Sequence, residues 1–119
     1  MDSELERQIR HNFEQLATDP AFALDRVWLT FYLQGDPADL GALAEQLERQ
    51  GWSNLDGSEG GFLYPKRALS NAAEVLIECA VATRAFCERR SIEILAIDAD
   101  TSPEPGRSRF RTLFRSPNR

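Results

Sequence analysis

The feature that most constrains the fold is the stretch at residues 27–51, VWLTFYLQGDPADLGALAEQLERQG, which predicts a strand, a turn and a helix in succession. Its first seven residues are apolar, β-branched or aromatic, and such side chains on both faces are typical of a central strand. Asp36 and Pro37 are typical of a helix start, and Gly51 can end the helix in the left-handed conformation. An apolar stripe between them has helical spacing, at Leu40, Leu43, Ala44 and Leu47. The stretch therefore predicts a strand followed by a helix that packs on one of its faces.

The rest of the chain continues the alternation of helices and strands. We expect an amphipathic helix at residues 3–18, short strands at residues 52–55 and 61–66, a long helix at residues 70–90 and a final strand at residues 92–97. After the first helix the order is β-α-β-β-α-β, and two right-handed crossings joined by a hairpin generate the ferredoxin-like sandwich. The predicted class is therefore α+β, with a four-stranded antiparallel sheet, two helices on one face and an extra N-terminal helix.

The first strand predicts which side chains the helices leave uncovered. One alternating row suits the helix-covered face: Val27, Leu29, Phe31 and Leu33. The other row would then look toward the opposite side: Trp28, Thr30 and Tyr32. Trp52, Phe62 or Tyr64 from neighbouring strands would add aromatic rings to that side. The alternative is that the N-terminal helix folds over this side and buries the rings in a second small core.

Charge is unevenly distributed along the chain. The 119 residues carry a formal net charge of −5, yet residues 107–119 hold five arginines and no acidic group. Residues 1–106 therefore hold nine basic and nineteen acidic groups, a net charge of −10. We expect one acidic domain at residues 1–102 and a basic tail at residues 103–119. A mobile tail is the first expectation, and an added edge strand or docking on the acidic domain is the alternative.

Several classes of protein are disfavoured by the composition. No apolar run approaches the roughly 20 residues that span a bilayer, and the start MDSELERQ does not have the pattern of a secretory signal. We therefore expect a cytoplasmic protein with no membrane partner. The acidic domain disfavours direct binding of nucleic acid and favours a protein partner with a basic surface. RNA binding through the basic tail is a separate hypothesis.

Few groups in the sequence could carry catalysis. His11 is the only histidine, no CxxC pair is present, and no serine or cysteine lies in a nucleophile motif. Cys79 and Cys87 fall on one predicted helix about 12 Å apart, which is too far for a disulfide. We therefore predict a protein that is not an enzyme and uses no catalytic residue, cofactor or metal.

Binding is the remaining class, and five residues are candidates for a partner-binding site. They are Trp28, Tyr32, Tyr64, Asp98 and Asp100. Exposed aromatic rings are the residues that anchor protein partners. The two aspartates could bind a cation or act as an acid pair, although two acids in a solvated loop are a more common finding.

The sequence resembles the regulator of ribonuclease activity B family over residues 5–100. The resemblance is carried by a leading helix, the segment RVWLTFYLQGDPADLGALAEQLERQGW, a short hairpin, a long helix and a final strand that ends in an aspartate. It implies a ferredoxin-like fold and a role as a protein inhibitor of ribonuclease E. The family commonly ends its last strand with Tyr-Asp-Gly-Trp, where this chain has Ile97-Asp98-Ala99-Asp100, so only Asp98 carries over. Arginines also replace the acidic tail of the inhibitors.

The sequence therefore predicts a non-enzymatic bacterial regulator that binds a basic protein partner, and the resemblance implies that the partner is a ribonuclease. The alternative from another class is an immunity-type or small-molecule-binding module on the same fold. Its ligand would lie in a pocket between the sheet and the N-terminal helix.

Overall fold

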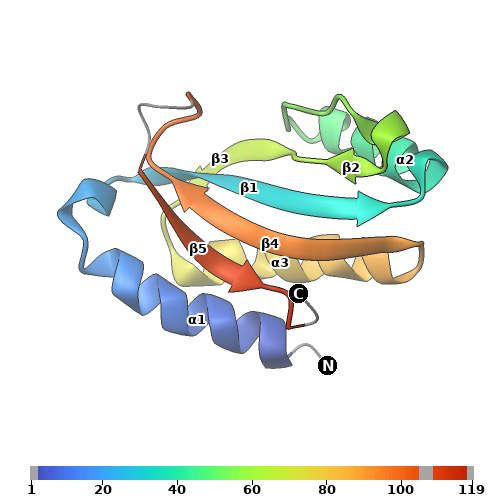
Figure 1. Ribbon diagram of the computed structural model, residues 1–119. Coiled ribbons are helices and arrows are strands. Elements are labelled where there is room, and N and C mark those ends of the chain that lie inside the picture. Colours follow the sequence, from blue (N-terminus) through green and yellow to red (C-terminus); the bar gives the residue numbers. More distant parts are fainter. Residues whose placement is uncertain (1–2, 105–108, 118–119) are drawn as a thin grey trace.

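The computed structural model describes residues 3–104 and 109–117. These residues form three α-helices and an antiparallel sheet of five strands, joined by loops (Figure 1). The helices are α1 (Ser3–Ala17), α2 (Pro37–Arg49) and α3 (Ala73–Glu88), with short 3-10 helices η1 (Pro20–Phe22) and η2 (Ser58–Gly60). The strands are β1 (Arg26–Gly35), β2 (Phe62–Leu63), β3 (Lys66–Ser70), β4 (Ile92–Asp100) and β5 (Phe110–Arg115). Residues 105–108 and 118–119 of the expected tail lie outside the described residues. The class is α+β, as predicted, and no helix in the described ranges is long and apolar enough to cross a membrane.

Strand β1 occupies the centre of the sheet. It pairs with β4 on one side and with β2 and β3 on the other, and β5 lies along the outer side of β4. Strands β2 and β3 keep one register with β1, which puts Tyr64 opposite Tyr32. Pro65 interrupts the pairing because it has no amide hydrogen, although its carbonyl still accepts a hydrogen bond from the amide of Phe31 (3.1 Å). Strands β2 and β3 are thus two parts of one interrupted strand, which overlaps the strand predicted at residues 61–66.

The strand predicted at residues 52–55 is reduced to a single bridge. Ser53 exchanges two backbone hydrogen bonds with Lys66 (2.9 and 3.0 Å). The next residue, Asn54, has a φ of 60°, which turns the chain out of the extended conformation. Its side-chain amide donates instead to the carbonyl of Tyr64 (2.8 Å). The prediction of a four-residue edge strand was therefore wrong, because one left-handed residue ends the pairing.

The C-terminal segment supplies the fifth strand. A mobile tail was the wrong expectation for residues 110–115, which pair with β4. Helix α1 holds the outer edge of this strand, because Asn12 Nδ2 donates to the carbonyl of Leu113 (2.8 Å). The side-chain amide of Gln8 also accepts from the amide of Arg115 (3.0 Å) and donates to its carbonyl (3.1 Å). The sheet therefore has five strands where four were predicted, and the last one is joined to α1.

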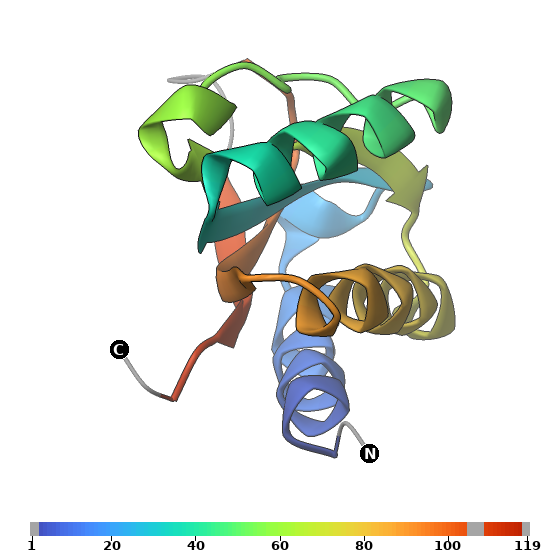
Figure 2. The same ribbon diagram turned by 90° about the vertical axis from the view of Figure 1, so that its right-hand side faces the viewer.

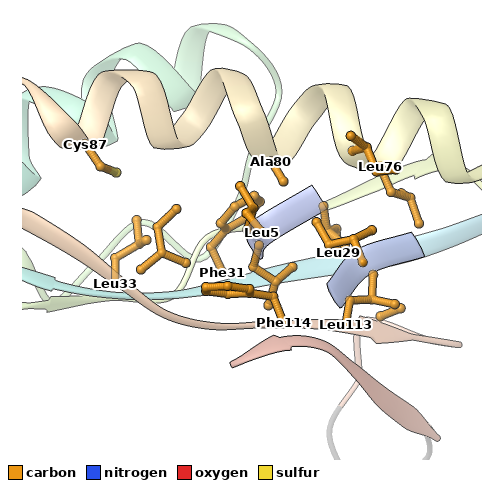
Figure 3. Packing of buried hydrophobic residues seen from close by; sticks show 14 of the residues in the cluster. Leu5, Leu29, Phe31, Leu33, Leu76, Ala80, Cys87, Leu113 and Phe114 are labelled. Carbon is orange, nitrogen blue, oxygen red and sulfur yellow. The ribbon is translucent and has the colours of Figure 1, made fainter. Parts of the chain in front are cut away.

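One face of the sheet carries the hydrophobic core. Four alternating side chains of β1 are at most 1% exposed: Val27, Leu29, Phe31 and Leu33. Figure 3 shows three α3 side chains pointing toward this row, namely Leu76, Ala80 and Cys87. Full burial of one large apolar side chain contributes about 1.5–3 kcal/mol, so this row fixes the orientation of β1. The other row of β1 consequently faces away from the helices: Trp28, Thr30 and Tyr32.

Helix α1 packs on the same side as the core. It lies against α3 and β5, whereas α2 lies against β1, β2 and η2 near the other edge of the sheet. Figures 1 and 2 show α2 set apart from the other two helices. Leu5, Ile9 and Leu16 of α1 belong to the same buried cluster as Leu29. The N-terminal helix therefore does not cover the row that contains Trp28, contrary to the alternative left open by the sequence.

The turn between β1 and α2 packs directly on the turn between α3 and β4. A Cβ atom added to Gly35 would lie 2.1 Å from the carbonyl oxygen of Ser91. The amide of Asp36 donates to that same carbonyl (3.0 Å), and the amide of Ser91 donates to the carboxylate of Asp39 (3.1 Å). These contacts join the two turns and leave no space for a side chain at residue 35.

The substitution Gly35→Ala is expected to lower the free energy of unfolding by about 3 kcal/mol, because the new methyl group forces the two turns apart. The matched control is Gly41→Ala inside α2, where an added Cβ meets no atom within 4 Å. The control should gain up to about 1 kcal/mol from helix propensity. Urea unfolding of both variants measures the difference, and equal effects would contradict the packing of the two turns.

Candidate functional site

The side of the sheet without helices is the candidate functional site, and we call it the open face. Trp28 pairs with Asp100, and Thr30 pairs with Asp98 on β4 and with Lys66 on β3. The open face consists of Trp28, Thr30, Tyr32, Phe62, Tyr64, Lys66, Asp98, Asp100, Phe110 and Thr112. It contains all five residues that the sequence nominated for partner binding. Their proximity is thus a structural observation, whereas their role in binding stays a prediction.

Aromatic rings form one half of the open face. The rings of Tyr32 and Tyr64 lie 5.5 Å apart between centroids, and Phe62 stacks on Tyr64 at 6.3 Å. Phe62 and Tyr64 are each 39% exposed, and Phe110 at the far side is 63% exposed. Rings this exposed on a sheet surface are typical of an interaction surface.

Two carboxylates lie beside these rings. Asp98 is only 8% exposed, and Asp100 accepts a hydrogen bond from the hydroxyl of Thr30 (3.2 Å). Among the described residues, neither aspartate has an Arg or Lys within salt-bridge distance. The charge of Lys66 acts on Asp100 from farther away. The open face therefore holds negative charge that the described residues do not neutralise by direct contact.

Burial changes the acidity of two groups on this face. It raises the pKa of the Tyr32 hydroxyl, and the neighbouring carboxylate of Asp98 raises that pKa further. Burial also raises the pKa of Asp100, an effect opposed by the hydrogen bond from Thr30 and the charge of Lys66. Both shifts disfavour negative charge in the folded protein.

Other reactive side chains lie away from the open face. His11 is exposed on α1, and Cys79 and Cys87 are free thiols on α3. Burial raises the pKa of Cys79 to about 11 and that of Cys87 to about 12, so both stay protonated and weakly nucleophilic at neutral pH. In the described parts of the chain, no three His, Cys, Asp or Glu residues are grouped so that they could hold a metal ion.

A cavity of about 570 Å³ lies on the helix-covered side, at the end of the sheet where β5 finishes. Its lining includes Glu4, Arg84, Cys87, Glu93, Phe114 and Ser116. None of the five nominated residues lines it. The cavity corresponds in position to the pocket between sheet and N-terminal helix that the alternative function requires.

Three aromatic or charged residues differ from expectation. Trp52 is buried against Phe31, with ring centroids 5.6 Å apart, so it belongs to the core and not to the open face. Lys66, which the sequence did not nominate for the site, brings a positive charge to the open face. Phe110 was missed because its position depends on β5, while Lys66 could have been found from its alternation with Tyr64 along one strand.

Comparisons with protein-family models, with curated proteins and with solved structures found no match to this chain.

The pKa of Tyr32 predicts an alkaline limit to stability. Because folding disfavours the phenolate, the contribution of Tyr32 is complete below the ordinary tyrosine pKa of 10.0 and is lost as the pH rises above it. Urea unfolding at increasing pH should show this loss in the natural protein and a smaller loss in Tyr32→Phe. Identical alkaline curves for the two proteins would contradict the environment assigned to Tyr32.

The substitution Asp100→Asn tests the cost of the second carboxylate. Its raised pKa means that the stabilising contribution is complete below the ordinary value of 3.8 and is lost as the pH rises and Asp100 ionises. The amide still offers an oxygen to Thr30, so at neutral pH the variant should be as stable as the natural protein or slightly more stable, by less than about 1 kcal/mol. A clear destabilisation in urea unfolding at neutral pH would show that the charge stabilises the fold.

Proposed function

We propose that this chain is a non-enzymatic regulatory protein that binds a protein partner through the open face. The observation that carries the proposal is that exposed aromatic rings and two carboxylates without a contacting cation share the uncovered side of the sheet. Interfaces of this composition bind through a few anchoring rings and gain specificity from charge. The expected partner has a basic surface with apolar side chains.

The proposal that the partner is a ribonuclease rests on two arguments together, the fold and the resemblance of the sequence to a known family. We propose that β1, α2, the interrupted strand, α3 and β4 form a ferredoxin-like β-α-β-β-α-β unit, to which α1 and β5 are added. The regulator of ribonuclease activity B family, which the sequence resembles, combines such a fold with inhibition of ribonuclease E. We therefore infer a cytoplasmic regulator of a ribonuclease.

Regulation would act by occupying a surface of the partner. The net charge of −10 over residues 1–106 would steer a basic partner toward the domain, and the rings of the open face would then hold it. Direct binding of nucleic acid is not proposed for β5, because Arg111 pairs with Asp19 (3.4 Å). The pKa of Asp19 is lowered mainly by the amide of Ala21, with Arg111 adding to the effect.

Purified ribonuclease E is the first partner to test. The double substitution Phe62→Ala, Tyr64→Ala removes two exposed rings and should weaken calorimetric binding by at least about tenfold, because such rings commonly dominate interface energy. The matched control is Leu24→Ala, whose side chain is similarly exposed (44%) but lies in the loop before β1. Absence of binding by the natural protein would refute the ribonuclease as partner, and equal binding by both variants would refute the open face as its site.

The same titration should depend on salt. Because steering by an acidic surface is screened over about 10 Å at 0.1 M ionic strength, affinity and association rate should fall as salt rises from low to physiological concentration. Binding that is indifferent to salt over this range would contradict the electrostatic part of the proposal.

The cavity of about 570 Å³ favours a second candidate, a small-molecule-binding module. Its volume is within the range of ligand pockets, and Arg84 with Glu93 would supply polar contacts. A ligand that perturbs the amide signals around this cavity and leaves those of the open face unchanged would support this candidate over the first.

A further inference from the structure

The centre of the open face alternates rings with carboxylates across two strands. Trp28 and Asp100 are cross-strand neighbours, as are Thr30 and Asp98, while Tyr32 follows next along β1. Asp98 and Asp100 are two residues apart on β4, which is about 7 Å along a strand, and the charge of Asp98 acts on Asp100, so both carboxylates lie within reach of one bound group. The small side chain of Thr30 is 1% exposed and forms the floor between the rings.

The two carboxylates determine the charge of a group that could bind here. Asp98 is nine-tenths buried beside the Tyr32 hydroxyl, which hydrogen-bonds to it. A carboxylate in such a site can pair closely with a cation and with an aromatic neighbour. Lys66 is the described cation that acts on Asp100, and it does not reach salt-bridge distance from either aspartate. A cation supplied by a partner would therefore neutralise the carboxylates of Asp98 and Asp100.

The surroundings favour guanidinium over other cations. A guanidinium group is planar, bonds carboxylates in pairs and stacks on aromatic rings, and both kinds of neighbour are present here. A metal ion is disfavoured, because the described residues provide only two carboxylates at this place. A symmetric contact between the open faces of two copies is disfavoured too, since it would set Asp98 and Asp100 against the same acids.

We propose that the open face takes an arginine side chain from a segment of a protein partner, with its guanidinium between Asp98, Asp100 and the rings of Trp28 and Tyr32. The flanking exposed rings of Phe62, Tyr64 and Phe110 would receive apolar side chains on either side of that arginine. This inference rests on the proposed function, because it names the chemistry of the partner at the same site.

Three short peptides test it, with arginine, citrulline or lysine between the same leucine residues, together with arginine amide alone. Nuclear magnetic resonance titration of the full chain should show the arginine peptide shifting the amide signals of residues 28–32 and 96–100. Citrulline has the same shape without the charge and should bind at least about tenfold more weakly. Lysine should also bind more weakly, since it lacks the planar group. Equal binding of the arginine and citrulline peptides, or shifts spread over other acidic surfaces, would overturn the proposal.

Variants of the protein test, in the same titration, whether the two carboxylates bind the arginine. The single variant Asp100→Asn and the double variant Asp98→Asn, Asp100→Asn should each bind the arginine peptide at least about tenfold more weakly. The control Glu48→Gln, at an exposed position of α2, should leave the affinity unchanged. Lys66→Gln should strengthen binding, because a competing cation is removed. The single Asp100→Asn variant decides the question if the double variant does not fold. Arginine amide that binds as tightly as the peptide would overturn the assignment to a protein segment.

The two proposals fail in different ways. If ribonuclease E loses affinity for Phe62→Ala, Tyr64→Ala but binds Asp98→Asn, Asp100→Asn like the natural protein, the open face binds a protein and the arginine site is wrong. If neither double variant changes the affinity for the ribonuclease, the proposed function fails. The peptide titration then still decides whether the open face binds arginine.

Discussion

The burial of one row of β1 side chains is the constraint on which the rest of the structure depends. Val27, Leu29, Phe31 and Leu33 are buried under the helices, and a strand cannot bury one row without presenting the other to the opposite side. A shift of one residue in register would exchange the rows completely. The position of the open face is therefore a consequence of core packing.

The open face combines features that the hydrophobic core does not have. It exposes large rings to water, and it holds Asp98 nearly buried without a described cation in contact. Natural sequences tend to break local rules of this kind at functional sites, which is why these residues are more informative than the equally prominent apolar residues of the core.

Much of this arrangement could be predicted from the sequence, because it follows from short-range patterns. The alternation in β1 indicated both its central position and the direction of Trp28 and Tyr32, and Asp36 does cap α2 through hydrogen bonds to the amides of Ala38 and Asp39. The same reasoning failed where one residue or a distant contact decides the outcome. Asn54 ends a strand through its backbone conformation alone, and β5 is held by side-chain amides that lie more than a hundred residues earlier in the chain. The conformation of Asn54 is not visible in the hydrophobic pattern, whereas the alternation at residues 110–115 left an added edge strand open without deciding for it.

The hydrogen bonds from Gln8 and Asn12 to the last strand have a consequence for self-association. An unpaired edge is a template on which further chains can add strands, and this is a common route to aggregation and amyloid. Here two amide groups imitate a neighbouring backbone along part of that edge, so further chains meet hydrogen-bonding groups that are already occupied. The sheet is thereby protected from growing sideways at this border while its flat surface stays accessible.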